Sequence, residues 1–342
     1  MTKFTIHATD AVVKAVMDLC AVKGSHLTLA IISKHLYMAA ISPEFFKILD
    51  MNTIIESDDL AIRIQKTMIK PLLSNECSLQ FTVNKNVIIT RSFESTILSA
   101  VAVPLEYDFN NELIAQVILA GSKTTELYNI SSLIRLRPLL AYCEAGIQYK
   151  DGLAYMLGND FFVYCELAGS GNFIMTNSNI TELIKFIRAY GEMKIYESGV
   201  HIVFHKGYSY FGCRQPIAFV DSEYESFKQM TPIKTLTANL TELHLILKAF
   251  TIPKGETPDC KFMLSKGIAT IDIGDCYHFD VLVGSGVEGI PDFSLPVEVL
   301  KKIFSNIYID YNKVDVLIYE PLVVFKFGDI QILIRRSDSW ED

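Results

Sequence analysis

The chain of 342 residues is 50% hydrophobic and 20% charged, which is enough apolar material for large cores and argues against a disordered protein. Its net charge of −8 argues against a general nucleic-acid-binding protein, because such proteins usually display an overall basic surface. No apolar run reaches the roughly 18 residues of a membrane helix, and the N-terminus lacks the basic and apolar regions of a signal peptide. We therefore expect a soluble intracellular protein whose 7 scattered cysteines are reduced.

The first third of the chain is predicted to contain two helices among strands. Thr9 and Asp10 cap a helical pattern over residues 11–23, and a similar acidic cap precedes a second pattern over residues 60–74. Residues 106–110 are expected to form a linker. Alternating or continuous apolar runs predict the strands of this region, at residues 3–7, 27–32, 79–83, 87–91 and 97–103.

The middle third contains the clearest unit of the sequence, which is one helix followed by a meander of strands. Asn179 and Glu182 have the spacing of a capping box, and apolar residues then recur at helical spacing to about residue 192. Two-residue alternation follows and predicts three strands within residues 194–213. Upstream of this unit, residues 112–119 are predicted to form a strand and residues 124–136 a helix.

The last third repeats the same pattern. Residues 239–242 copy the Asn-x-Thr-Glu opening of the preceding capping box and begin a helix that ends near residue 250. Pro296 suits the first turn of a second helix, over residues 297–306. The predicted strands of this region are residues 233–238, 261–264, 269–273, 277–283, 314–319, 323–327 and 330–335.

The predicted helices form two interleaved series with one period. The first series begins near residues 9, 124 and 240 and the second near residues 59, 179 and 296, so that each step is about 115 to 120 residues. A period of this length predicts three copies of one α+β domain, each with two helices packed on antiparallel sheets, because the strands are joined by short turns. The expected boundaries are residues 1–107, 108–230 and 231–342.

The charge on these helices differs from the charge of the whole chain. The helices carry thirteen basic against eight acidic residues, and most of the acids lie at caps or in first turns, where the helix dipole favours them. Lysines on solvated helix faces would explain any single helix, but six basic helices in an acidic chain suggest a positive surface that contacts phosphates without reading sequence. The basic residues are Lys14, Lys23, Arg63, Lys66, Lys70, Arg135, Arg137, Lys185, Arg188, Lys248, Lys254, Lys301 and Lys302.

Three further stretches extend the pattern. The chain opens with the strand Lys3-Phe4-Thr5-Ile6, residues 219–224 form an extended segment before the last third, and apolar residues 332–334 lie near the C-terminus. With its three copies of two helices each, the chain resembles the DNA sliding clamps of the three-domain bacterial type, the β subunit of the replicative polymerase, as a divergent bacterial or viral member. It departs from that family in lacking the usual proline in residues 219–224 and the usual Met-Pro-Met region of the tail.

The resemblance implies a ring-forming homodimer, assembled head to tail around double-stranded DNA, which tethers a DNA polymerase and is opened by a separate clamp-loader ATPase. It implies no catalysis, cofactor, metal or membrane. All of the basic residues above except Lys254 would then contact DNA without sequence preference. The resemblance also implies a groove for short partner peptides, formed by Leu157, Phe161, Phe162, Val220, Phe227, Ile332 and Ile334.

Other interpretations of the sequence are weaker but stay open. A clamp-like adaptor that never encircles DNA would have the same repeats. A hydrolase could use Asp272, Asp275 and Asp280, which cluster near Cys276 and His278, although a turn between strands explains these residues more simply. The Gly284, Gly286 and Gly289 spacing matches a dinucleotide fingerprint but is followed by Ile-Pro-Asp rather than a helix. His201 and His205 share a strand face without a third metal ligand nearby.

Overall fold

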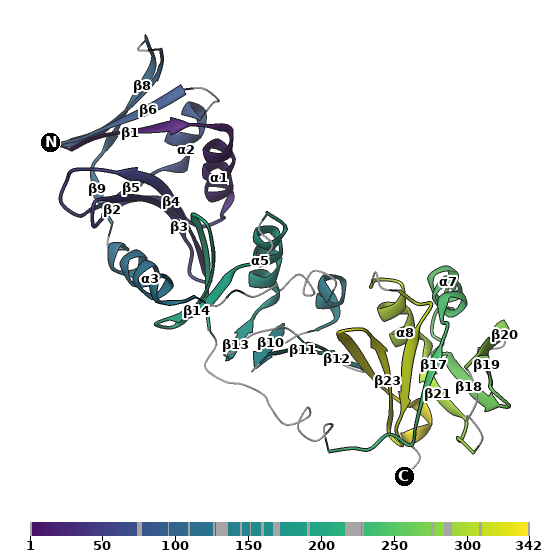
Figure 1. Cartoon of the computed structure of the whole chain (residues 1–342). Helices are drawn as coiled ribbons and strands as arrows, with labels where there is room; N and C mark the ends of the chain where they lie inside the picture. The colour runs from purple at the N-terminus through teal and green to yellow at the C-terminus, as the bar shows by residue number, and fades with distance from the viewer. Residues whose placement is uncertain are drawn as a thin grey trace. The chain divides into compact units, whose positions relative to one another are not determined.

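The computed structural model describes two compact units, formed by Met1–Tyr128 with Glu192–Gln215 and by Asn129–Gly191 with Pro216–Asp342 (Figure 1). In the described part of the chain, no helix is long and apolar enough to cross a membrane. The description covers the whole chain except residues 1, 74–76, 95, 109, 126, 128–135, 144–145, 151, 159–160, 167–171, 190–191, 216–226, 228, 275–276, 284–288, 308–309 and 341–342.

The described elements repeat three times in the order strand, helix, four strands, helix, three strands. The first repeat is β1 (Thr2–Ala8), α1 (Asp10–Ala21), β2 (His26–Ile32), β3 (His35–Ile41), β4 (Phe45–Ile54), β5 (Leu60–Ile64), α2 (Lys66–Ile69) with the 3₁₀ turn η1 (Lys70–Leu72), β6 (Cys77–Val83), β7 (Asn86–Phe93) and β8 (Thr96–Pro104). The second is β9 (Glu106–Tyr107), α3 (Asn111–Lys123), the 3₁₀ turn η2 (Arg137–Tyr142), β10 (Ile147–Lys150), β11 (Leu153–Leu157), β12 (Phe161–Glu166), β13 (Asn172–Met175), α5 (Asn177–Ala189), β14 (Lys194–Ser198), β15 (His201–Lys206) and β16 (Ser209–Arg214). The third is β17 (Lys234–Ala238), α7 (Thr241–Ala249), β18 (Asp259–Ser265), β19 (Ile268–Ile273), β20 (Tyr277–Leu282), β21 (Phe293–Pro296), α8 (Val297–Phe304), β22 (Val314–Ile318), β23 (Leu322–Phe327), β24 (Ile330–Arg335) and the 3₁₀ turn η3 (Ser337–Trp340). The predicted α+β class with three copies of a two-helix pattern is therefore confirmed.

The first unit contains a four-stranded sheet, β1-β6-β7-β8, and an eight-stranded sheet, β14-β15-β16-β4-β3-β2-β5-β9. Alternate residues of β6, such as Leu79 and Phe81, are buried in a core shared with α1 and one face of β2 to β5. The other face of the eight-stranded sheet packs against α3 through Ile114 and Val117. Because β2 and β3 are covered on both faces, they are buried nearly continuously rather than at alternate residues.

The second unit is built in the same way, from the eight-stranded sheet β13-β10-β11-β12-β24-β23-β22-β17 and the four-stranded sheet β20-β19-β18-β21. Helices α7 and α8 lie side by side (Figure 1). The ring of Phe304 on α8 packs against Tyr311, Phe325 and Phe327, which anchors this helix on the sheet. In both units every described pair of neighbouring strands is antiparallel.

Two predicted elements are wrong. The helix expected over residues 60–74 is instead strand β5, the single turn α2 and η1, because residues 60–64 pair with β2 and Pro71 prevents a longer helix. The strand expected over residues 112–119 is part of α3, whose buried residues Ile114, Val117 and Gly121 have helical spacing. Most of the helix expected over residues 124–136 lies outside the described residues.

The expected linker at residues 106–110 contains a buried carboxylate. Asp108 accepts hydrogen bonds from Thr28 Oγ1 at 2.5 Å and His26 Nε2 at 2.9 Å, and its other oxygen accepts from the backbone and side-chain amides of Asn110 at 3.2 and 2.7 Å. Burial by itself would raise the pKa of Asp108, but the hydrogen bonds and the neighbouring histidine lower it below the ordinary 3.8. Asp108 therefore connects the start of α3 to β2.

Candidate nucleic-acid and partner interfaces

The exposed faces of the helices carry several of the predicted phosphate-binding cations. Lys14 on α1, Lys70 in η1, Lys185 on α5 and Lys248 on α7 are exposed. Lys185 forms an ion pair with Glu182 at 2.5 Å, one turn away on the same helix. Such an exposed pair is weak, so it leaves the ammonium group available to a phosphate.

Lys66 and Lys301 have a different environment from the one expected of free surface cations. The ammonium group of Lys66 donates to the carbonyl of Val22, the residue that ends α1, and that of Lys301 donates to the carbonyl of Phe250, which ends α7. In the second repeat, Lys194 donates to Gly121 O in the last turn of α3 at 3.5 Å. In all three repeats a lysine thus satisfies a carbonyl at the negative end of the first helix.

The remaining predicted cations are not all on helices. Arg63 lies on strand β5, opposite Glu106 of β9, rather than on the predicted helix with Lys66 and Lys70. Lys23 follows the end of α1 in a turn, Lys254 lies in a turn after α7, and Arg137 begins η2; all three are exposed. Lys302 pairs with Glu298 at 2.7 Å and lies over the ring of Tyr142. Arg135 and the side chain of Arg188 lie outside the described residues.

The helical surface also contains a cation that the sequence pattern missed. Lys123 ends α3 and is exposed, but the region before it was predicted to be a strand. The first helices are also less basic than expected, since α1 carries Asp10 and Asp18 beside Lys14, and α3 and α7 each carry one glutamate and one lysine. The positive excess of the described helices therefore lies mainly on the second helix of each repeat.

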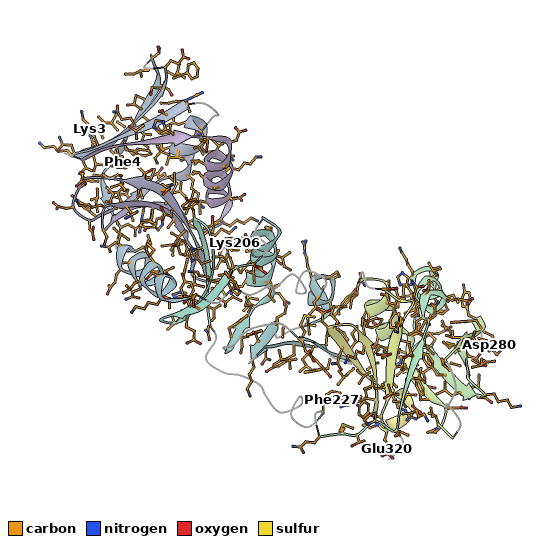
Figure 2. All side chains as sticks on the ribbon, in the orientation of Figure 1. Lys3, Phe4, Lys206, Phe227, Asp280 and Glu320 are labelled. Atoms are coloured by element: carbon orange, nitrogen blue, oxygen red, sulfur yellow. The ribbon has the colours of Figure 1, made fainter. Side chains whose placement is uncertain are left out.

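An aromatic cluster covers one face of the second unit's eight-stranded sheet. Its buried members are Tyr155, Tyr164, Tyr319, Val324 and Leu333, and partly buried Leu153, Phe162, Phe227, Met230, Leu317 and Leu322 pack around them. The Phe227 ring lies 5.5 Å from Tyr319 and 5.8 Å from Tyr164. Phe227 lies at the same end of the unit as Glu320 (Figure 2). We call this set of residues the aromatic cluster.

The residues predicted to form a peptide groove divide between the two faces of this sheet. Phe162 and Phe227 belong to the aromatic cluster, and Leu157 pairs across β11 and β12 with Phe162 and is 37% exposed. Phe161, Ile332 and Ile334 alternate onto the opposite face and are buried. Successive strand residues face opposite sides of a sheet. On β24 it is therefore Leu333, between Ile332 and Ile334, that belongs to the aromatic cluster, together with Tyr164 of the paired strand β12. Val220 lies outside the described residues.

The comparisons with known proteins identify the fold. No protein-family profile and no curated protein sequence matches the chain. Solved structures match along its whole length. A proposed DNA polymerase III β subunit from Eubacterium rectale has a TM-score of 0.67 at 12% identity and covers 99% of this chain and 100% of its own. The DNA polymerase III β subunit of Pseudomonas aeruginosa has 0.65 at 13%, and the DNA polymerase sliding clamp of Caulobacter crescentus has 0.68 at 11%; each covers 98% of this chain and 99% of its own.

The chain has the sliding-clamp fold. The resemblance inferred from its repeats is confirmed at the level of architecture. At sequence identities of 11 to 13%, individual motifs are too weak to identify the fold. The order of helices and strands along the chain is what indicated it.

Within this clamp fold, repeats are joined by strand pairing. The last strand of the second repeat, β16, pairs antiparallel with β4, the third of the four consecutive strands in the first repeat. The last strand of the third repeat, β24, pairs in the same way with β12 of the second repeat. β8 is the last strand of the first repeat and so corresponds to β16 and β24, and β20 is the third of the four consecutive strands in the third repeat and so corresponds to β4 and β12. In the described structure, each of these two strands is instead an edge of a four-stranded sheet.

Both of these edges expose large apolar side chains. On β8, Ile97 is 69% and Leu98 is 51% exposed, and on β20, Leu282 is 79% and Tyr277 is 42% exposed. An exposed apolar edge strand with unpaired backbone groups is a template for pairing with another chain. Asp280 marks the position of β20 (Figure 2).

The residues considered for other chemistry lie mostly on exposed strands. Asp272 and His278 are cross-strand neighbours joined by a hydrogen bond of 2.5 Å, and Asp280 accepts one from Thr270. Asp275 and Cys276 are outside the described residues, as is Gly284 with most of its glycine-rich segment. Burial lowers the pKa of both His201 and His205. Among the residues that the structure describes, no cluster of three or more potential metal ligands occurs.

Proposed function

We propose that the protein is a sliding clamp, a processivity factor that encircles duplex DNA as a homodimer and tethers a polymerase to it. The single observation that carries this proposal is the pair of open edges, β8 and β20. Within the chain, two pairs of strands join consecutive repeats, β16 with β4 and β24 with β12. A pairing of β8 with β20 would be a third joint of the same kind, between two copies of the chain. We also propose the repeat boundaries 1–107, 108–230 and 231–342 for its three domains.

A head-to-tail joint between β8 of one copy and β20 of a second would complete an eight-stranded sheet like the two within each chain. It would also remove Ile97, Leu98 and Leu282 from water, and burying such side chains stabilises an interface by about 25 cal/mol per Å². Two copies each contribute one edge of each kind, so that a dimer with two identical joints closes on itself.

DNA contact is proposed to come from the exposed cations of the helical regions. These are Lys14, Lys23, Lys70, Lys123, Arg137, Lys185 and Lys248. Point charges on flexible side chains bind phosphates without sequence preference, and individually weak contacts exchange as the ring moves along the duplex. Lys66 and Lys301 act instead through the helix ends that they cap.

The aromatic cluster is the proposed docking surface for partner peptides. It combines partly buried apolar side chains from β11, β12 and β23 with Phe227 and Met230 of the preceding connection. Large aromatic side chains at the centre of a surface commonly provide most of its binding energy. The C. crescentus clamp carries polyethylene glycol at its region proposed for β-motif tethering, and the P. aeruginosa clamp carries griselimycin. Griselimycin is therefore a practical probe of this chain.

The proposed role needs no reaction at the protein. A ring that cannot leave DNA raises the effective concentration of a bound polymerase at the primer end, which increases the length of each synthesis event. A closed ring must be opened before it can encircle DNA, so the proposal includes a loader ATPase as a partner. An adaptor that does not encircle DNA is the alternative that the following test distinguishes.

The test compares retention on circular and linear DNA. Purified protein is loaded with an extract that supports replication, and the DNA-bound fraction is isolated by gel filtration at high salt, which removes simple electrostatic binding. We expect the protein to remain on nicked circles and to dissociate after one restriction cut. Leu282→Lys, which places a charge at the proposed joint, should abolish retention on circles. Equal behaviour on circular and cut DNA would contradict encirclement.

A further inference from the structure

A turn of the second unit supplies two members of the aromatic cluster. It joins β22 to β23 and is closed by the Tyr319 amide, which donates to Leu322 O at 2.9 Å. Tyr319 is buried and Leu322 is partly buried in the cluster, and the Tyr319 ring lies 5.5 Å from that of Phe227. Glu320 also lies in this turn, at the same end of the unit as Phe227 (Figure 2). We call residues 319–322 the Tyr319 turn, and its path decides where Tyr319 meets Phe227.

Arg336, the residue that follows β24, binds this turn through both its backbone and its side chain. Its amide donates to Pro321 O at 3.1 Å, and its Nη1 donates to Tyr319 O at the longer distance of 3.5 Å. Arg336 is only 8% exposed, so little of its guanidinium group is accessible to a partner at the surface. An effect of Arg336 on docking must therefore pass through the turn that it contacts.

Three further contacts fix the guanidinium group itself. Nε and Nη2 donate to the two carboxylate oxygens of Asp338 at 3.1 and 2.5 Å, and Nη2 also donates to Asp292 O at 3.3 Å. The group lies 5.8 Å from the centre of the Phe293 ring. A planar guanidinium can bind a carboxylate with two hydrogen bonds and reach carbonyl oxygens at the same time, which the ammonium group of a lysine cannot do in this geometry. Arg336 thus links the Tyr319 turn to the start of β21.

Asp338 is itself held by β21. Its Oδ1 accepts from the backbone amide of Ser294 at 3.3 Å. Burial by itself would raise the pKa of Asp338, but the hydrogen bonds from Arg336 and Ser294 lower it below the ordinary 3.8, so the carboxylate is charged near neutral pH. The guanidinium group is therefore fixed from β21 and can hold the turn in place.

The equivalent position of the first unit shows which of these contacts the fold itself needs. Gln215 follows β16 as Arg336 follows β24, and its amide donates to Val200 O, in the turn between β14 and β15, at 2.9 Å. The backbone contact is thus common to both units, and the first unit makes it without an arginine. The guanidinium contacts occur in the unit whose turn carries residues of the aromatic cluster.

We infer that Arg336 is a positioning residue of the proposed docking surface, which holds the Tyr319 turn so that Tyr319 lies against Phe227 before a partner peptide binds. This inference rests on the proposed function and assigns to it a residue that acts without touching the partner. A surface that is already ordered binds more tightly, because no binding energy is used to order it. Without the guanidinium only a fraction of the molecules has Tyr319 in place, and the apparent affinity falls in proportion to that fraction.

The test is a double-mutant cycle on griselimycin binding by the full chain, measured by isothermal titration calorimetry. Arg336→Met keeps the aliphatic part of the side chain and removes the guanidinium, and we expect it to weaken binding roughly fivefold. Tyr319→Ala should weaken binding at least as much. Because Arg336 acts through Tyr319, the double variant should bind no more weakly than Tyr319→Ala alone. The melting temperature, by contrast, should fall on Arg336→Met in both backgrounds.

Gln215→Met is the matched control, since it changes the equivalent residue of the first unit, and it should leave the affinity unchanged. Asp338→Asn, at a side chain that is 36% exposed, is a milder second variant and should weaken binding about twofold. Wild-type affinity in whichever of Arg336→Met and Asp338→Asn folds, or an equal loss of affinity from Arg336→Met with and without Tyr319, would overturn the inference while leaving the docking surface intact. A wild type that does not bind griselimycin, or a Phe162→Ser variant that binds it unchanged, would overturn both.

Discussion

At the scale of single residues, Asp108 is the clearest case of a side chain whose role depends on burial. Asp108 and Asp310 make the same local hydrogen bonds, in which each aspartate accepts from the backbone and side-chain amides of the asparagine two residues on, Asn110 or Asn312. Asp310 is exposed, whereas Asp108 is buried and also accepts from Thr28 and His26. Replacing each aspartate by asparagine therefore separates the turn from the buried network.

We expect Asp108→Asn to lower the free energy of unfolding by about 2 to 3 kcal/mol, because hydrogen bonds to a buried charged group are lost. Asp310→Asn should cost less than about 0.5 kcal/mol. Urea unfolding monitored by circular dichroism measures both. Equal effects of the two substitutions would show that burial at Asp108 does not matter.

The lowered pKa of Asp108 adds a pH dependence to this prediction. A carboxyl group whose pKa falls on folding stabilises the protein above its unfolded pKa, and this contribution is lost as the pH falls through the folded pKa. The difference in stability between wild type and Asp108→Asn should therefore shrink as the pH falls below about 4. A difference that grows on acidification would contradict the assigned hydrogen bonds.

At the scale of elements, the lysine caps predict which cations are structural. Lys66→Met keeps the aliphatic chain but removes the donor to Val22 O, and should lower the stability of the fold by about 1 kcal/mol. Burial lowers the pKa of Lys66, so part of the gain from capping is offset by the cost of desolvating the charge. Lys70→Met, an exposed lysine one turn away, should change stability little. Chemical denaturation of both variants measures the difference, and equal stabilities would contradict the cap.

The aromatic cluster makes a separate prediction at this scale. Phe162→Ser should weaken griselimycin binding at least tenfold, since it removes a central aromatic group while leaving the buried Tyr155 and Tyr164 in place. Tyr208→Ser, at an exposed turn of the first unit, is the control and should have no effect. Isothermal titration calorimetry gives both affinities. Unchanged binding by Phe162→Ser would place the ligand elsewhere.

The elements also show what the sequence could predict. Amphipathic helices with clear caps, such as α1 and α7, and hairpins with glycine turns, such as β15 with β16, were predicted because their signals are local. β5 and α3 were not, since a short apolar run fits both periods and its strand or helix partner is distant in sequence. The sequence also did not show which face of the sheet Ile332 and Ile334 occupy. Alternation shows which residues share a face, and only the neighbouring strands and the layers packed on them decide what covers that face.

At the scale of the whole molecule, the open edges predict the oligomeric state. Ile97→Lys or Leu282→Lys should convert a dimer into monomers, because each places a charge in the proposed β8–β20 joint. Ile54→Lys is the matched control, since Ile54 is also 69% exposed but lies on an internal strand. Light scattering after gel filtration measures the mass. If Ile54→Lys also produced monomers, the added charge itself, rather than its position in the proposed β8–β20 pairing, would be responsible.

The most direct measurement is the solution mass of the wild type together with a negative-stain image of the same fraction. We expect a two-fold ring of about 77 kDa, twice the 38.5 kDa chain, with a central opening wide enough for duplex DNA. A monomer at every concentration, or a compact dimer without an opening, would contradict the claim that the two free sheet edges close a ring.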